Sequence, residues 1–406
     1  MSNPQNPEWL DSTNREGESF DLPSVVPLDF DSLVNAAKAK AGLDDFGEDY
    51  WQAPLKMLCD DLNSVAELTL FGRLMARNDL LIWLNQRLEI TELTKRHPEI
   101  LQQAIVAPMF IVGLPRSGTS ILFEVLAQDP DVGVPKMWES MLPTPPPETA
   151  TYSTDKRIEH AHQLFTQWNR AVPEFATVHE MAGDIPAECG LIMAGSFISD
   201  HIASLHMSDN YGGWHAQADL TPAYQWHKIM LQVLQWKNPR KRWLLKAPAH
   251  QSKLDTLLKI YPDARIIQTH RDPIQCMGSA TNLMACLYKM RTNKPFNAAA
   301  FDEFLVGEAT AQRLELVIDQ VASGVVPKQS LCDSRYCDLM DQPIDCVEHI
   351  YQYFDMPLTE ATKQRILDYL AAKPKGKFGA HNYQSDATER HYFDRYQKHY
   401  QVPSEV

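Results

Sequence analysis

Residues 110–120 read FIVGLPRSGTS, an apolar run followed by a glycine-bounded loop and then by hydroxyl residues that open a helical segment. A strand delivers such a loop to the edge of a sheet, and Gly113 and Gly118 permit backbone angles that other residues avoid. The first N–H groups of the helix, at Thr119 and Ser120, then point at an anion. The order of strand, loop and helix predicts an anion-binding turn in an α/β fold.

The spacing of the two glycines is that of a phosphate-binding loop, G-x-x-x-x-G. Thr119 stands where a Walker A loop has its lysine, and a cation, Arg116, lies inside the loop instead. Ser117 is not expected to be a hydrolase nucleophile, because the G-x-S-x-G motif requires glycine where this chain has Pro115. Taken alone, the segment is also compatible with an ordinary strand-to-helix turn.

A second segment, Ala264 to His270, reads ARIIQTH and is followed directly by Arg271. Arg271 should lie at the carboxyl end of a strand, where open α/β sheets bind their ligands. Ser279 comes about two helical turns later, so that a guanidinium and a hydroxyl can hold one phosphate from two sides. A loop for one anion and an Arg/Ser pair for another predict a ligand with two well-separated phosphates.

The ends of the other apolar runs argue against a nucleoside triphosphatase. Such an enzyme holds Mg²⁺ with an aspartate at the end of a neighbouring strand. Here the run RWLLK ends in Lys246, and the run ARIIQTHR ends in His270 and Arg271. These cations neutralise phosphate charge without a metal, so no metal site is predicted. A metal-dependent nucleotide kinase or triphosphatase is kept only as an alternative.

Composition limits the possible partners of the chain. Its 406 residues carry a net charge of −14, whereas nucleic-acid binders need a basic face. No stretch approaches the ~20 apolar residues of a transmembrane helix, and the polar, acidic N-terminus has no signal-peptide core. We therefore expect a cytoplasmic protein with no membrane span and no nucleic-acid partner. The sequence does not indicate an oligomeric state.

The chain is predicted to be organised in three parts. Residues 1–28 are expected to form a flexible tail, and 29–104 an N-terminal helical cap, in which Asp29 or Asp31 begins a helix that Gly42 ends. Residues 105–406 should form the α/β domain, a P-loop-like parallel sheet flanked by helices. Its strands are expected at 109–113, 243–246, 264–269 and 330–332, alternating with helical patterns.

The loop GLPRSGTS and the segment THRDPIQCMGS resemble the 5′-phosphosulfate loop and the 3′-phosphate motif of sulfotransferases that use 3′-phosphoadenosine 5′-phosphosulfate. The phrases LDDFGEDYW, LPTPPP and WLLKAPAH resemble a mostly bacterial branch of that superfamily, and the likeness extends from about Asp29 to Tyr400. The resemblance implies a parallel sheet of P-loop ancestry and transfer of a sulfuryl group to a hydroxyl or amine. The acceptor would be a small molecule or a lipid, and no metal would be needed.

The resemblance also implies roles for particular residues. Arg116 would neutralise charge as the sulfuryl group departs. Lys246 would touch the bridging oxygen or the transferring group, unless it is an ordinary solvated lysine at a strand end. Arg271 and Ser279 would bind the 3′-phosphate. The residues implied for the 5′-phosphosulfate are Arg116, Ser117, Gly118, Thr119 and Ser120.

Two further assignments to the donor site rest on a less specific resemblance. Tyr336, in SRYCDL, resembles a tyrosine that contacts adenine, although a core tyrosine is an equally good interpretation. Lys375 and Lys377 resemble a C-terminal loop that closes on the 3′-phosphate, but the departure from that loop is large. A solvated charge run explains these two lysines at least as well.

The acceptor base is the most open assignment. An attacking alcohol must lose its proton to a Glu or His within hydrogen-bond reach. Glu139 is favoured because several sulfotransferase branches carry a catalytic glutamate about two dozen residues beyond the phosphosulfate loop. His250, four residues after Lys246, and His179 are the alternatives. A module that binds 3′-phosphoadenosine 5′-phosphate without turnover would need no base, and it remains the second alternative function.

Overall fold

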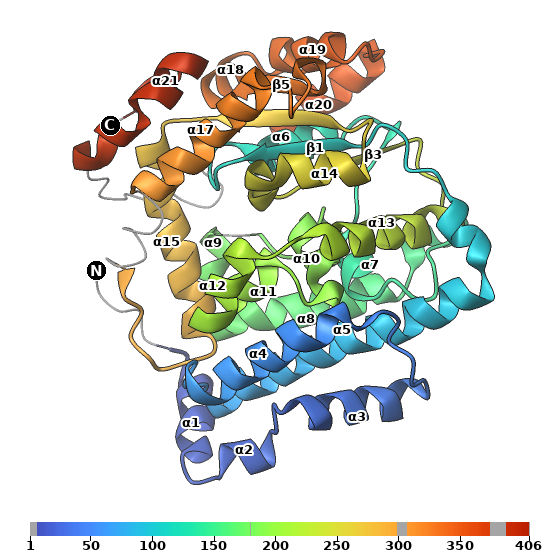
Figure 1. Cartoon of the computed structure of the whole chain (residues 1–406), viewed down its shortest axis with the longest axis vertical. Coiled ribbons are helices and arrows are strands. Elements are labelled where there is room, and N and C mark those ends of the chain that lie inside the picture. The colour runs from blue at the N-terminus through green and yellow to red at the C-terminus, as the bar shows by residue number, and fades with distance from the viewer. Residues whose placement is uncertain (1–5, 179, 299–306, 374–386, 406) are drawn as a thin grey trace. The chain divides into compact units, whose positions relative to one another are not determined.

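A computed structural model describes residues 6–178, 180–298, 307–373 and 387–405 (Figure 1). The chain divides into two compact units. The helical unit comprises Met1–Ala104, Lys136–Pro239 and Leu283–Phe296, and the sheet unit comprises Ile105–Pro135, Arg240–Asn282 and Asn297–Val406. The sequence-based division placed 105–406 in one α/β domain, whereas 136–239 and 283–296 belong to the helical unit.

The described part of the sheet unit contains five parallel strands in the order β2-β3-β1-β4-β5. The central strand β1 pairs with β3 on one side and with β4 on the other, with Gly113 opposite Thr269. The α/β class and the parallel sheet predicted from the sequence are therefore confirmed. One strand, β2, was not expected, because two residues are too few to show a periodic pattern. The strands are β1 (Met109–Gly113), β2 (Val132–Gly133), β3 (Arg242–Lys246), β4 (Arg265–His270) and β5 (Leu331–Arg335).

Both faces of this sheet are covered, which explains why its strands are apolar without alternation. Met109 and Ile111 of β1 pack in one cluster with the buried face of α6 (Thr119–Leu126) and with α19 (Pro343–Tyr353). Phe110, between them, contacts the ring of Tyr261 at 5.3 Å between centroids. Helix α15 (Pro273–Lys289) begins in this unit and continues past Asn282 into the helical unit. The other described helices of the sheet unit are η5 (Pro248–Lys253), α14 (Leu254–Ile260), α17 (Glu308–Ala322), η6 (Lys328–Ser330), α18 (Tyr336–Asp341), α20 (Glu360–Ala372), η7 (Ala387–Phe393) and α21 (Asp394–Tyr400).

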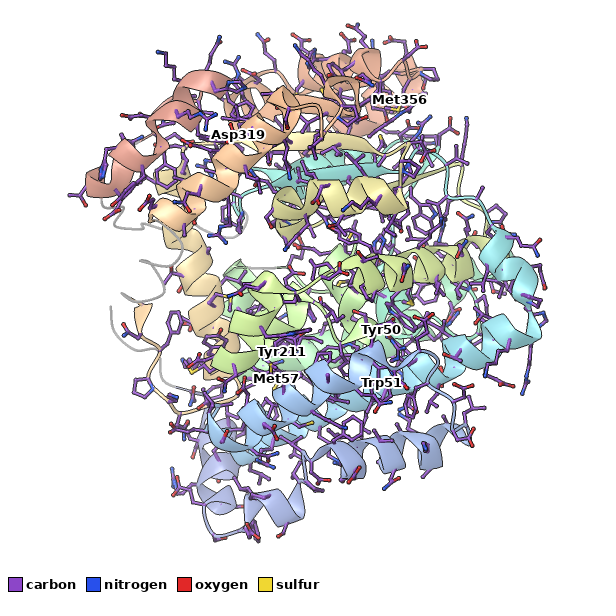
Figure 2. All side chains as sticks on the ribbon, viewed as in Figure 1. Tyr50, Trp51, Met57, Tyr211, Asp319 and Met356 are labelled. Carbon is purple, nitrogen blue, oxygen red and sulfur yellow. The ribbon has the colours of Figure 1, made fainter. Side chains whose placement is uncertain are left out.

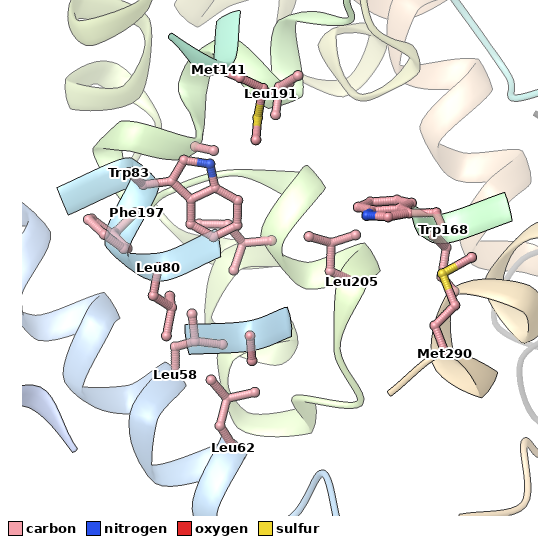
Figure 3. Close-up of a cluster of buried hydrophobic side chains, with 14 of the residues drawn as sticks. Leu58, Leu62, Leu80, Trp83, Met141, Trp168, Leu191, Phe197, Leu205 and Met290 are labelled. Carbon is pink, nitrogen blue, oxygen red and sulfur yellow. The ribbon is translucent and has the colours of Figure 1, made fainter. Parts of the chain in front are cut away.

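The described part of the helical unit is built from helices around one large apolar core (Figure 3). In Figure 3, Trp83 of the long helix α5 lies near Leu80 of the same helix and near Phe197, which comes from a distant part of the chain. The helices are α1 (Glu8–Gly17), α2 (Leu22–Val25), α3 (Phe30–Ala41), η1 (Asp49–Trp51), α4 (Gln52–Ser64), α5 (Leu70–Arg96), η2 (Pro98–Gln102), α7 (Met137–Met141), η3 (Tyr152–Thr154), α8 (Arg157–Ala171), α9 (Phe175–Val178), α10 (Cys189–Met193), η4 (Ala194–Ser196), α11 (Asp200–Leu205), α12 (Asp209–Gln217) and α13 (Thr221–Trp236).

The segment expected to be a flexible tail differs from that expectation over residues 6–28. It forms α1 and α2, and Leu10 is fully buried in the core of the helical unit. Gly17 packs so tightly that an added Cβ would lie 2.6 Å from the Cβ of Leu70. The side chain of Asn14 accepts a hydrogen bond from the N–H of Phe71 at 3.2 Å. One buried leucine and one close glycine contact give no recognisable helical pattern in a polar sequence, so α1 was not predicted.

Arg87 is one of the buried cations of the helical unit. The guanidinium of Arg87, on α5, donates to the carbonyl oxygens of Phe46 and Gly195 at 3.0 Å each. It also lies 4.9 Å from the ring centroid of Tyr50, which Figure 2 labels beside Trp51. Burial lowers the pKa of Arg87 from its ordinary value, while Tyr50 and Glu48 oppose that shift. A buried guanidinium needs such acceptors, so the carbonyls of two distant chain segments bond to one side chain.

The structure decides which aspartate begins α3. Asp29 accepts a hydrogen bond from the N–H of Ser32 at 2.8 Å, and Gly42 ends the helix with φ +65°. We expect Asp29→Ala to lower the free energy of unfolding by about 1 kcal/mol, because the helix loses its side-chain cap. Asp31→Ala should cost only a few tenths, since Asp31 acts only through the helix dipole. Urea unfolding followed by circular dichroism checks this, and equal losses would contradict it.

Candidate active site

The loop after β1 is fixed to the neighbouring strand β4. Gly113 has φ +143°, and an added Cβ would lie 2.2 Å from Oγ1 of Thr269, so no larger residue fits there. Ser117 is 1% exposed, and its Oγ lies 2.6 Å from Oγ1 of Thr269 and donates to the carbonyl of Leu114 at 2.7 Å. The hydroxyl of Ser117 therefore holds the loop in shape, and β4 determines where the loop lies.

The loop ends where α6 begins. Gly118 has φ +96° and precedes the helix, whose first residues are Thr119 and Ser120. The first N–H groups of a helix have no partner within it and carry its positive dipole end, which favours a bound anion. Arg116 is exposed and adopts a left-handed φ of +69°, a conformation that costs a non-glycine residue about 1 kcal/mol. The strand, the loop and the helix thus follow one another as the sequence predicted, with a strained arginine in the loop.

Lys246 joins this group from β3. It ends the strand, is 3% exposed, and its Nζ donates to Oγ of Ser120 at 3.2 Å. The alternative of a solvated strand-end lysine does not describe it. Because β3 and β4 both pair with β1, the residues that follow these three strands meet at one edge of the sheet.

Arg271 links the loop after β1 with the segment after β4, two motifs that lie far apart in the sequence. Its Nη1 donates to the carbonyl of Arg116 at 3.1 Å, and its guanidinium lies 4.1 Å from the ring centroid of Tyr336. The same ring packs on Gly118, where an added Cβ would meet it at 2.7 Å. Burial lowers the pKa of Arg271, but the hydrogen bond and charge of Glu405 together with other nearby groups outweigh burial and raise it. The ring of Tyr336 therefore packs against both the loop, at Gly118, and the guanidinium of Arg271.

Sequence reasoning missed Asp272. This residue is fully buried, and its carboxylate accepts from the N–H of Ile274 at 3.1 Å, from the N–H of Glu405 at 2.7 Å and from Nη2 of Arg390 at 3.0 Å. It begins α15 and anchors the C-terminal segment. The only signal for it was its position before Pro273, which is typical of a residue that precedes a helix.

The candidate bases lie in different environments. Glu139 belongs to the helical unit, is fully buried in α7, and its Oε2 accepts from the N–H of Lys136 at 2.9 Å and from the Tyr152 hydroxyl at 3.0 Å. His250 belongs to the sheet unit, is 2% exposed and packs edge-to-face on Phe110 at 5.3 Å.

Some predicted residues lie partly or wholly outside the described structure. His179, Lys375 and Lys377 are not among the described residues, and Ser279 is described only as part of the backbone of α15.

Within the described ranges, no group of three or more His, Cys, Asp or Glu side chains is arranged to hold a metal ion. No helix of the described chain has both the length and the apolar character needed to cross a membrane.

The described sheet unit is an α/β fold with five parallel strands and a glycine-bounded loop between its central strand and the helix that follows. A sequence profile described as the sulfotransferase family matches residues 108–360, more than half of the chain. The chain belongs to this family, as the resemblance of its two motifs predicted.

Two solved structures of sulfotransferases are similar to this chain. Sulfotransferase STF9 from Mycobacterium avium is 27% identical, with a TM-score of 0.85 over 95% of this chain and 99% of that chain. Sulfotransferase STF1 from Mycobacterium tuberculosis H37Rv is 30% identical, with a TM-score of 0.72 over 84% of this chain and 93% of that chain.

A curated relative carries a substrate in its name. Omega-hydroxy-beta-dihydromenaquinone-9 sulfotransferase Stf3, from Mycobacterium bovis and from Mycobacterium tuberculosis, is 24% identical over 278 residues. The aligned region is 65% of this chain and 66% of the relative, so the chain spans just under two thirds of the length of these relatives.

Proposed function

We propose that this protein transfers a sulfuryl group from 3′-phosphoadenosine 5′-phosphosulfate to a hydroxyl, or an amine, of a small-molecule or lipid acceptor. Family membership supports the reaction class. The observation that supports the choice of donor is the hydrogen bond from Arg271 to the carbonyl of Arg116, because it joins the two segments that we propose to bind the phosphates. A donor with phosphate groups on both its 3′ and 5′ positions needs two such motifs side by side.

In this proposal the loop and α6 bind the 5′-phosphosulfate. The N–H groups of Gly118, Thr119 and Ser120 face its oxygens, and Arg116 neutralises its charge. Ser117 contributes by fixing the loop to β4, because its hydroxyl is already bonded to Thr269 and Leu114.

In this proposal, residues that follow β4 and β5 hold the 3′-phosphate and the adenine ring of the donor. Arg271 supplies a planar pair of donors that matches phosphate oxygens, and Ser279, on α15, adds a hydroxyl. Tyr336 offers a ring against which the adenine can stack. The ring of Tyr336 contacts Gly118 of the loop and Arg271, which supports a position between the two proposed phosphate sites.

Lys246 is assigned to the departing group. As the sulfur–oxygen bond to the donor breaks, negative charge grows on the bridging oxygen, and a buried cation stabilises that charge more strongly than a solvated one. The bond from Lys246 to Ser120 places the ammonium group at the start of α6, beside the residues proposed to hold the phosphosulfate.

The acceptor oxygen attacks sulfur, gives its proton to a base, and leaves as a sulfate ester, while 3′-phosphoadenosine 5′-phosphate is released. Glu139 is our first candidate for that base and His250 the second. The relative named for a dihydromenaquinone substrate suggests a lipid hydroxyl as acceptor. Mass spectrometry of sulfated products, formed from a lipid extract and labelled donor, tests that suggestion.

We expect the protein to bind 3′-phosphoadenosine 5′-phosphate with a Kd of about 10 μM or tighter in the presence of EDTA. The reason is that Arg116, Lys246 and Arg271 supply the positive charge that a metal would otherwise provide. Isothermal titration calorimetry with and without EDTA measures this. Binding that is absent in EDTA and restored by Mg²⁺ would instead favour a metal-dependent kinase or triphosphatase.

A further inference from the structure

The guanidinium proposed to hold the 3′-phosphate is already paired with a carboxylate. Nε of Arg271 donates to both oxygens of Glu405, at 2.8 and 3.1 Å, and Nη2 donates to Oε2 at 2.7 Å. The two side chains are 18% and 31% exposed. This is the two-donor geometry by which arginine recognises either a carboxylate or a phosphate. Glu405 thus uses the same donors that a phosphate would use.

The position of Glu405 is supported by several independent contacts. Its N–H donates to Asp272 at 2.7 Å, and Arg390 bridges the Asp272 carboxylate and Oγ of Ser404. Val402 packs in a buried apolar cluster with residues of α15, α17 and α21. The segment 387–405 is therefore docked on the Arg271–Asp272 pair, and the carboxylate of Glu405 is held against Arg271.

From this geometry we infer that Glu405 is an internal competitor for the donor, which occupies Arg271 until a 3′-phosphate displaces it. The inference rests on the proposed function, because it assumes that Arg271 binds that phosphate. The two anions cannot share the same donors, and they repel each other. The protein must therefore release Glu405 before the phosphate binds, and the apparent affinity falls by the fraction of molecules in which Arg271 is available.

The competition should be selective. A ligand that contacts only the loop after β1 does not need Arg271, so Glu405 does not oppose it. A ligand with a 3′-phosphate does need Arg271, and it brings more negative charge than a carboxylate. Glu405 thus lowers the affinity for donor and for its 3′,5′-bisphosphate product alike, which favours product release after transfer.

The test compares two nucleotides by calorimetry on the full chain. In Glu405→Gln and in Glu405→Ala, the Kd for 3′-phosphoadenosine 5′-phosphate should fall roughly tenfold, the size expected for removing a partly buried charged pair. The Kd for adenosine 5′-monophosphate should stay within about twofold of wild type. Two substitutions are used because a glutamine amide can itself still bond to Arg271.

Glu315→Gln is the matched control. Glu315, on α17, pairs with Arg395 of the same docked segment at 3.0 Å, and Arg395 also bonds to Asp319, labelled in Figure 2. This variant makes the same change in net charge and loosens the same segment without removing Glu405. Its Kd for both nucleotides should match wild type.

Four results would overturn the inference. An unchanged or weaker affinity for the bisphosphate in both Glu405 variants would show that Glu405 does not compete. Equal tightening for both nucleotides, or tightening in Glu315→Gln, would show a general effect of charge. Absence of bisphosphate binding in wild type would overturn the proposed donor site itself, and with it this inference.

Discussion

Replacing Arg271 by alanine should weaken binding of 3′-phosphoadenosine 5′-phosphate by about 2–3 kcal/mol, which is roughly 30- to 150-fold in Kd. The phosphate loses a charge-assisted pair of hydrogen bonds. The loop also loses the hydrogen bond at the Arg116 carbonyl and the packing of the guanidinium on Tyr336. Isothermal titration calorimetry at one fixed salt concentration measures the change.

Two comparisons make this result specific. Arg365→Ala removes the same charge from an exposed position of α20 in the sheet unit, and it should leave the Kd nearly unchanged. Arg271→Lys keeps the charge but loses the planar pair of donors, so it should fall between wild type and Arg271→Ala. Equal affinities in wild type and Arg271→Ala would remove the second phosphate site from the proposal.

Glu139→Gln should lower kcat by about 10²- to 10⁴-fold while donor binding remains nearly unchanged, the range usual for loss of a general base. A base acts only as the acceptor proton moves, so the ground-state donor complex does not depend on it. Glutamine keeps one oxygen that can accept from Lys136 or Tyr152, so the fold of α7 should persist. Single-turnover kinetics with a sulfated-product readout, alongside donor calorimetry, measures both quantities.

The controls separate the three candidate bases. Tyr152→Phe removes a hydrogen bond to Glu139 but keeps the carboxylate, so its kcat should fall much less than in Glu139→Gln. His250→Ala and His179→Ala are measured in parallel, with thermal unfolding as a check because His250 packs on Phe110. Near wild-type turnover in Glu139→Gln, with collapse in His250→Ala, would transfer the role to the histidine.

Local signals in the sequence predicted most of the sheet unit. The apolar runs at 109–113 and 264–269 became β1 and β4, since a strand covered on both faces is recognisable from its own residues. The glycine spacing predicted the loop before α6, and Gly42 marked the end of α3, whose start was predicted at Asp29 or Asp31. These features depend on residues close together in the chain.

The sequence alone determined the fold class, the family and the residue types of the candidate donor site, because each of these is written in short, contiguous patterns. Only the tertiary structure decided which of those residues meet. Arg271 reaches the Arg116 carbonyl because β4 pairs with β1, and Glu405 reaches Arg271 across 134 positions of sequence. Such contacts depend on strand order and on how a distant segment docks, and neither leaves a periodic or compositional pattern near the residues concerned.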